Sequence, residues 1–111
     1  MAEQQRVRVW ADALIRLYLD SSWSFEFDHA KTRFGQCDHQ HRRITISRHL
    51  SARADDDEVH QVLLHEVAHA IAGARAGHGP QWKKIARELG YDGGRTHDHS
   101  VADEQARWRG V

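Results

Sequence analysis

Residues 55–74 read DDDEVHQVLLHEVAHAIAGA, an acidic start followed by an almost continuous apolar run. Acidic side chains in a first turn complement the helix dipole, and Asp55 with Glu58 three residues later can act as a capping box. The apolar residues that follow extend most of the way around a helix, so we expect this helix to be buried in the core. Gly73 marks its end. The stretch therefore predicts a buried helix around which the fold is organised.

Two histidines and a glutamate interrupt this apolar helix in the pattern His-Glu-x-x-His, at His65, Glu66 and His69. Residues four apart lie about 40° apart around a helix and about 6 Å along it, so both imidazoles can point at one ion. Zinc accepts that geometry, and the glutamate can act as general base on a water molecule at the ion. Unpartnered polar groups in a buried helix would be costly, which favours a metal site over an accidental pattern.

A catalytic zinc site needs a third protein ligand, for which the downstream sequence offers two candidates. His78 lies between Gly77 and Gly79, which let the backbone turn sharply back toward the buried helix. Glu88 lies on the predicted helix that follows. Position 75, where a metzincin-like pattern would place a histidine, is an arginine, so that pattern is excluded. We favour His78, and a closed structural site that includes Glu88 stays open as the alternative.

The flanking segments predict an α+β fold. Apolar spacing over 6–20 indicates an amphipathic helix with Leu17 and Tyr18 on its apolar face. Short strands are predicted at 23–28, 32–37 and 42–47, and a further helix at 81–89 between Pro80 and Gly90. We expect a small antiparallel three-stranded sheet packed against the buried helix, with an N-terminal helix and a following C-terminal helix.

Composition limits the class of protein. The chain has 111 residues, which predicts one domain over 1–111, with a core at 5–90 and a polar tail at 91–111. The formal net charge is zero, which argues against a strongly basic nucleic-acid binder. A single cysteine allows no internal disulfide and favours the cytoplasm. No uncharged run is long enough to span a membrane and no signal peptide is evident, so we expect a cytoplasmic monomer.

Several residues outside the motif have a structural interpretation. Cys37 is predicted to be a buried strand residue, because no neighbour in sequence marks it as a nucleophile. His39 and His41 have a spacing that suits metal binding, but we interpret them as solvated residues of a turn. Three residues of the tail are candidates for stabilising an oxyanion: Tyr91, Arg95 and His97.

Two motifs taken together carry a family resemblance. Residues 63–70 read LLHEVAHA, and residues 77–82 read GHGPQW. Upstream, residues 34–37 (FGQC) and 43–47 (RITIS) form the two strand motifs. The pair of H-E-x-x-H and G-H-G-x-x-aromatic elements, preceded by such Gly-x-Cys and I-x-(I/L)-S strands, resembles the SprT-like zinc metallopeptidases. The resemblance covers about residues 5–90.

The resemblance implies a zinc endopeptidase that acts on protein substrates, with one zinc ion per chain. It implies His65, His69 and His78 as zinc ligands and Glu66 as the catalytic acid/base. The Spartan branch of the family cleaves proteins crosslinked to DNA, so DNA and crosslink repair are implied by kinship alone. Many members carry a C-terminal zinc ribbon, which the single Cys37 cannot build. The alternative function is a non-catalytic, zinc-stabilised module that binds DNA or a protein partner.

Overall fold

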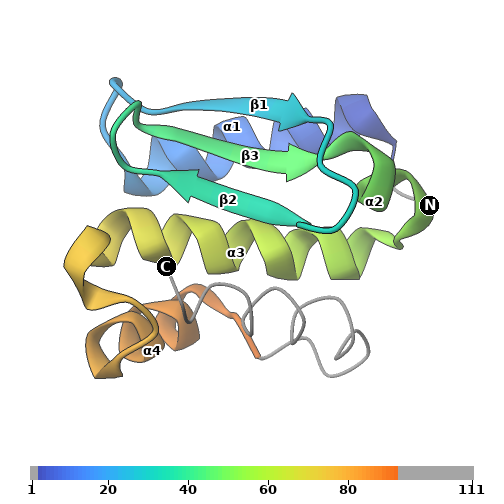
Figure 1. Cartoon of the computed structure of the whole chain (residues 1–111). Helices are drawn as coiled ribbons and strands as arrows, with labels where there is room; N and C mark the ends of the chain where they lie inside the picture. The colour runs from blue at the N-terminus through green and yellow to red at the C-terminus, as the bar shows by residue number, and fades with distance from the viewer. Residues whose placement is uncertain (1–2, 93–111) are drawn as a thin grey trace.

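The computed structural model describes residues 3–92 of the chain (Figure 1). The α+β fold class is confirmed, because a three-stranded sheet packs against the helix that carries the His-Glu-x-x-His motif. In chain order the elements are α1 (Gln4–Tyr18), β1 (Ser24–Asp28), β2 (Gly35–Asp38), β3 (Arg43–Ser47), α2 (Arg48–Arg53), α3 (Asp56–Ala72), the 3-10 helix η1 (Ala74–Ala76) and α4 (Pro80–Leu89). Of the predicted oxyanion candidates, Arg95 and His97 lie outside the described residues.

Helix α3 is the buried helix that the sequence predicts. Its N-terminus is capped by Asp55, whose carboxylate accepts a 2.8 Å hydrogen bond from the Glu58 backbone. The sheet and α1 cover one side of α3, and α4 covers another (Figure 1). The helix is buried continuously only through Ala68, and Ile71 in its last turn is 38% exposed. The metal-binding motif therefore lies where α3 passes from the core toward the surface.

The sheet differs from the predicted antiparallel meander. Its order is β1-β3-β2, and β1 pairs with β3 in parallel, whereas β2 and β3 are antiparallel. Residues 29–34 carry the chain past the end of β3, where Ser47 donates hydrogen bonds to the carbonyls of Phe34 and Ala30. The most buried strand, β3, thereby occupies the centre, and β2 begins later than predicted. This order places β2 at the edge of the sheet, next to α3.

Helices α1 and α3 lie side by side and run in the same direction. Arg6 and Asp56 form an ion pair at 3.2 Å near their N-termini, and one turn later Trp10 meets His60 edge-on. The buried stripe of α1 is Val7, Ala11 and Ile15. This pairing anchors the N-terminal half of α3.

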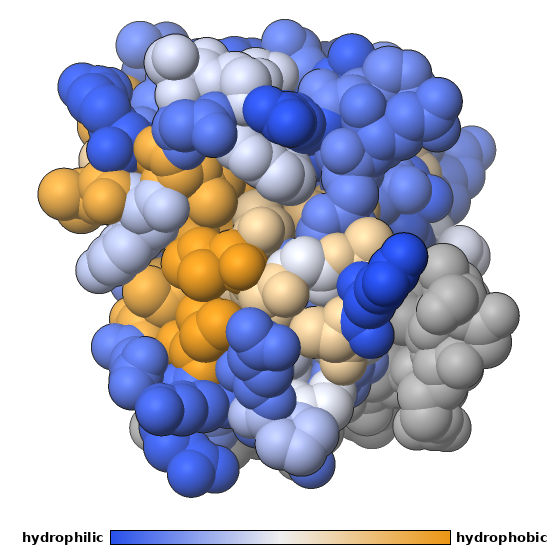
Figure 2. Space-filling view, turned by 90° about the vertical axis from the view of Figure 1, so that its left-hand side faces the viewer, coloured by the Kyte–Doolittle hydropathy of each residue, from blue (hydrophilic) through white to orange (hydrophobic). Residues whose placement is uncertain are grey.

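The prediction that Leu17 and Tyr18 are buried is wrong, since they are 73% and 47% exposed. Leu17 lies at the margin of the buried stripe and Tyr18 is the last residue of α1, so neither reaches the core. Figure 2 shows hydrophobic side chains gathered on the side of the molecule where α1 and α3 end. The large exposed hydrophobic residues of these helix ends are Leu17, Tyr18 and Ile71.

Two short elements complete the fold. Helix α2, to which the sequence analysis assigns no element, follows β3 directly and is capped by the Ser47 hydroxyl. Helix α4 runs from Pro80 to Leu89 and is capped by Gly90, which agrees with the predicted helix at 81–89 to within one residue. Among the described residues no helix has the length and apolar character needed to cross a membrane.

Candidate metal centre

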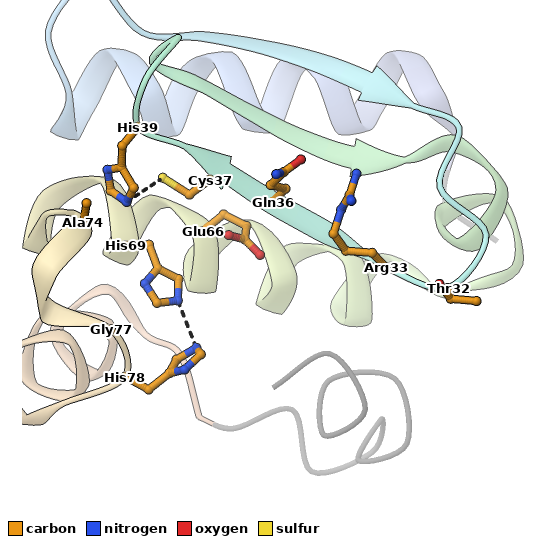
Figure 3. Close-up of a pocket in the computed structure, with 10 residues that line it drawn as sticks. All are labelled: Thr32, Arg33, Gln36, Cys37, His39, Glu66, His69, Ala74, Gly77 and His78. Carbon is orange, nitrogen blue, oxygen red and sulfur yellow. Dashed lines mark hydrogen bonds between the residues drawn. The ribbon is translucent and has the colours of Figure 1, made fainter. Parts of the chain in front are cut away.

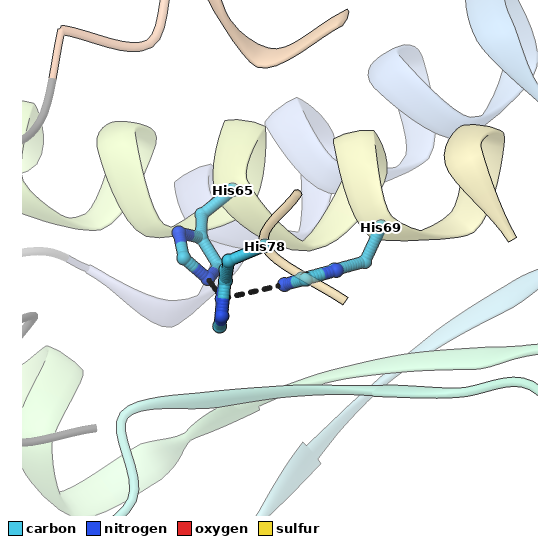
Figure 4. A group of neighbouring side chains, drawn as sticks. All are labelled: His65, His69 and His78. Atoms are coloured by element: carbon cyan, nitrogen blue, oxygen red, sulfur yellow. Dashed lines mark hydrogen bonds between the residues drawn. The ribbon is translucent and has the colours of Figure 1, made fainter. Parts of the chain in front are cut away.

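Three histidine side chains converge on one point (Figure 4). His65 and His69 project from consecutive turns of α3, and His78 comes from the loop between η1 and α4. The Nε2 atom of His78 lies 3.0 Å from that of His69 and 3.2 Å from that of His65. The spacing of the motif and the position of His78 therefore bring all three imidazoles together, as the sequence predicts.

This arrangement fits a zinc ion. Two nitrogens bound to one tetrahedral zinc at about 2.0–2.1 Å are separated by about 3.3–3.4 Å. The observed separations of 3.0 and 3.2 Å are close to that value. Three imidazoles are also a common protein ligand set for a zinc that keeps one position open. The three histidines could therefore hold a metal ion such as zinc.

The loop that carries His78 depends on Gly77. Helix α3 ends at Ala72 with Gly73 as its C-cap, and η1 then turns the chain so that the backbone of Gly79 donates to the carbonyl of Ala76 at 2.9 Å. Gly77 has a φ of +53° with ψ of −135°, a conformation that residues with a side chain rarely adopt. This sharp turn directs His78 back toward α3.

Trp82 of α4 forms a wall behind the three imidazoles. Its ring stacks on His69 at a centroid distance of 5.1 Å and meets His65 and His78 edge-on at 4.7 and 4.8 Å. The indole Nε1 donates a hydrogen bond to the carbonyl of His65. Trp82 thus restricts the orientation of every candidate ligand.

Burial keeps His65 and His69 neutral. Desolvation, followed by the charges of His69 and His78, lowers the pKa of His65 well below its usual value. Desolvation and then the neighbouring His78 and His39 lower the pKa of His69 to about 3. A neutral imidazole is the form that binds metals, so the site is set for metal binding at neutral pH.

Glu66, His69 and His78 open onto a pocket of 410 Å³ (Figure 3). Its α3 wall is formed by Glu66 and His69, and His78 lies at its lower side. Glu66 is only 1% exposed, and it lines this pocket together with His69 and His78. The pocket thus combines a candidate metal centre with a buried carboxylate that can accept a proton.

Comparison with models of protein families identifies the family of this chain. The model of the SprT-like family matches residues 5–101. The chain belongs to the SprT-like family. A comparison with curated proteins found no match. Membership is compatible with an enzyme of the metallopeptidase type.

The opposite wall of the pocket of this SprT-like protein contains residues that the sequence analysis missed. Cys37 and His39 line the pocket from β2 and the following turn, with Cys37 Sγ 3.7 Å from His39 Nε2. Burial, and then the charges of Glu66 and Asp38, raises the pKa of the Cys37 thiol. His39 is thus a half-buried pocket residue rather than a solvated one. These residues reach the site because β2 packs next to α3. The local sequence does not encode that packing.

Two further candidates lie within the described residues: Glu88, the alternative third ligand, and Tyr91, a candidate for stabilising an oxyanion. Glu88 is exposed on α4 and lines a separate groove with Lys83 and Lys84, so it is not brought to the histidines. The ring of Tyr91 meets that of His65 edge-on at 5.3 Å. Gln61, one turn before His65, holds this segment through its side-chain amide, which binds the backbone on both sides of Tyr91. Tyr91 therefore packs against the candidate ligand His65.

Proposed function

We propose that this SprT-like protein is a zinc-dependent endopeptidase that hydrolyses peptide bonds in protein substrates. In this proposal His65, His69 and His78 are the zinc ligands, and Glu66 is the general base. The observation that carries the proposal is the convergence of three imidazoles, those of His65 and His69 held neutral by burial, beside the buried carboxylate of Glu66. The pocket volume of 410 Å³ suits part of a peptide chain and falls in the usual range for ligand sites.

In the proposed peptide hydrolysis, the zinc ion and Glu66 have different roles. When bound, zinc supplies the Lewis acidity that acidifies a water molecule and polarises the peptide carbonyl. Glu66 accepts a proton from the attacking water and then delivers it to the nitrogen of the leaving amine. Trp82 holds the imidazoles in place during this exchange. Substrates bound to DNA are included in the proposal on family resemblance alone.

The test is a peptidase assay on zinc-loaded protein, with an unfolded protein and a protein held on DNA as substrates. The wild type should cleave at least one of them. Glu66→Gln should keep one zinc per chain and lose activity by about 10²–10⁴-fold, the usual contribution of a general base. Glu58→Gln, a change of the same kind near the start of α3, is the matched control and should retain activity.

Two results would contradict the proposal. The first is cleavage by Glu66→Gln at the wild-type rate. The second is a wild type that holds zinc and cleaves none of these substrates, which would favour the non-catalytic binding module.

A further inference from the structure

Strand β2 begins at Gly35, where its backbone passes close to α3. A methyl group added to Gly35 would lie 2.8 Å from Val62 Cγ1, 3.1 Å from Glu66 Oε2 and 3.2 Å from Glu66 Cγ. Carbon atoms in favourable contact are separated by about 3.5–4.0 Å, so a side chain here forces its neighbours to move. Gly35 is not among the glycines with positive φ. The position therefore requires glycine for space and not for backbone conformation.

The space beside Gly35 is taken largely by Glu66. Two of the three atoms nearest the absent methyl group belong to that side chain, and one of them is a carboxylate oxygen. Glu66 is 1% exposed, and its backbone is fixed because α3 is enclosed by the sheet, α1 and α4. An added methyl group must consequently be accommodated by a change in the Glu66 side chain.

We propose that Gly35 is a positioning residue for Glu66: the missing side chain at the start of β2 lets the Glu66 carboxylate lie against the strand at the pocket. The inference rests on the proposed function, in which Glu66 is the general base. None of the three atoms nearest the Gly35 methyl position belongs to His65, His69 or His78. Gly35 therefore acts on the base and leaves the metal ligands in place.

Val62 provides the means to separate this role from ordinary packing. Its Cγ1 atom makes the closest contact of all, and it lies one helical turn before Glu66 on the same face of α3. Val62→Ala removes that atom but leaves both contacts with Glu66. The double variant Gly35→Ala/Val62→Ala therefore removes the steric conflict between the added methyl group and Val62. It keeps the conflict between that methyl group and the Glu66 side chain.

The experiment compares zinc content, thermal stability, kcat and KM for Gly35→Ala, Val62→Ala and the double variant. Val62→Ala should keep the wild-type kcat. Gly35→Ala should keep one zinc per chain and a similar KM, but lose about 10²-fold in kcat, the usual cost of misplacing a catalytic group by about 1 Å. The double variant should regain stability without regaining kcat. Recovery of kcat with stability, or loss of zinc from Gly35→Ala, would overturn the proposal.

A binding measurement separates this inference from the peptidase proposal. A hydroxamate binds zinc as an anion, so a carboxylate that accepts its proton strengthens the binding. Calorimetry with acetohydroxamate should show binding about tenfold weaker for Gly35→Ala and for the double variant than for the wild type, a loss similar to that of Glu66→Gln. Unchanged affinity would overturn the role of Gly35. A wild type that binds hydroxamate but cleaves no protein would instead contradict the peptidase function alone.

Discussion

Mild acid should destabilise the metal-free protein because its unfolded chain binds protons that the buried histidines of the folded protein do not. His65 is 2% exposed, and desolvation followed by the charges of His69 and His78 lowers its pKa well below 6.5. Desolvation, and then His78 and His39, lowers the pKa of His69 to about 3. In the unfolded chain both imidazoles titrate near pH 6.5, which is the ordinary value to within about a unit.

The sign and size of the effect follow from proton linkage. Below pH 6.5 the unfolded chain binds protons that the folded protein does not, so the free energy of unfolding falls as the pH falls. Each histidine contributes about 1.4 kcal/mol per pH unit. Because the unfolded histidines are only half protonated at pH 6.5, the loss between pH 6.5 and 5.0 is about 1.5 kcal/mol for His65 and about 3 kcal/mol for His65 and His69 together.

Carboxylates act in a lower pH range. Hydrogen bonds from Ser22 and His41 lower the pKa values of Asp20 and Asp38 below 3.8. Their stabilising effect is complete above the unfolded value and is lost only as the pH falls through the folded one. The range from pH 6.5 to 5.0 therefore lies above the range in which Asp20 and Asp38 act.

The assay measures the free energy of unfolding by urea titration in the presence of a chelator. Unfolding is monitored by circular dichroism at several pH values between 7.5 and 5.0. His65→Gln should remove about half of the pH dependence in that range, whereas His29→Gln, at an exposed histidine, should leave it unchanged. A free energy of unfolding that stays constant from pH 6.5 to 5.0 would refute the reasoning. So would a His65→Gln variant with the wild-type slope.

Two further predictions concern the walls of the pocket. Trp82→Phe removes the hydrogen bond to the His65 carbonyl and should cost about 1 kcal/mol in urea unfolding, whereas Trp82→Ala should cost about 3–5 kcal/mol. An equal loss of free energy of unfolding in the two variants would show that the hydrogen bond, and not packing of the ring, accounts for the contribution of Trp82 to stability. Because burial and then the charge of Glu66 raise the pKa of Cys37, iodoacetamide at pH 8 should alkylate it slowly in the folded protein and faster in Glu66→Gln. Equal rates in folded and urea-unfolded protein would contradict this.

The parts of the site that the sequence predicts are those that local geometry determines. A helix places residues four apart on one face, so His65 and His69 could be paired before the structure was known. Asp55 and the apolar run likewise mark the start and burial of α3. The glycines around His78 indicate a sharp turn, and the turn returns to α3 as predicted.

The parts that the sequence does not predict depend on pairing between distant segments. Alternating polarity locates three strands, but it carries no information about which strand occupies the centre, and β1 pairs in parallel with β3. The edge position of β2 brings Gly35, Cys37 and His39 toward α3. The short Gly-x-Cys motif is visible in the sequence, but its contact with Glu66 becomes clear only when the two elements pack together.

The central claim is that His65, His69 and His78 hold one zinc ion, and zinc stoichiometry tests it most directly. The measurement is native mass spectrometry after mild chelation and zinc reloading, for the wild type, His78→Ala and His39→Ala. His39→Ala is the matched control, because His39 lines the same pocket without belonging to the cluster. We predict one zinc per chain in the wild type and in His39→Ala, and markedly weakened binding in His78→Ala. A His78→Ala variant that holds zinc as tightly as the wild type would contradict the three-histidine site.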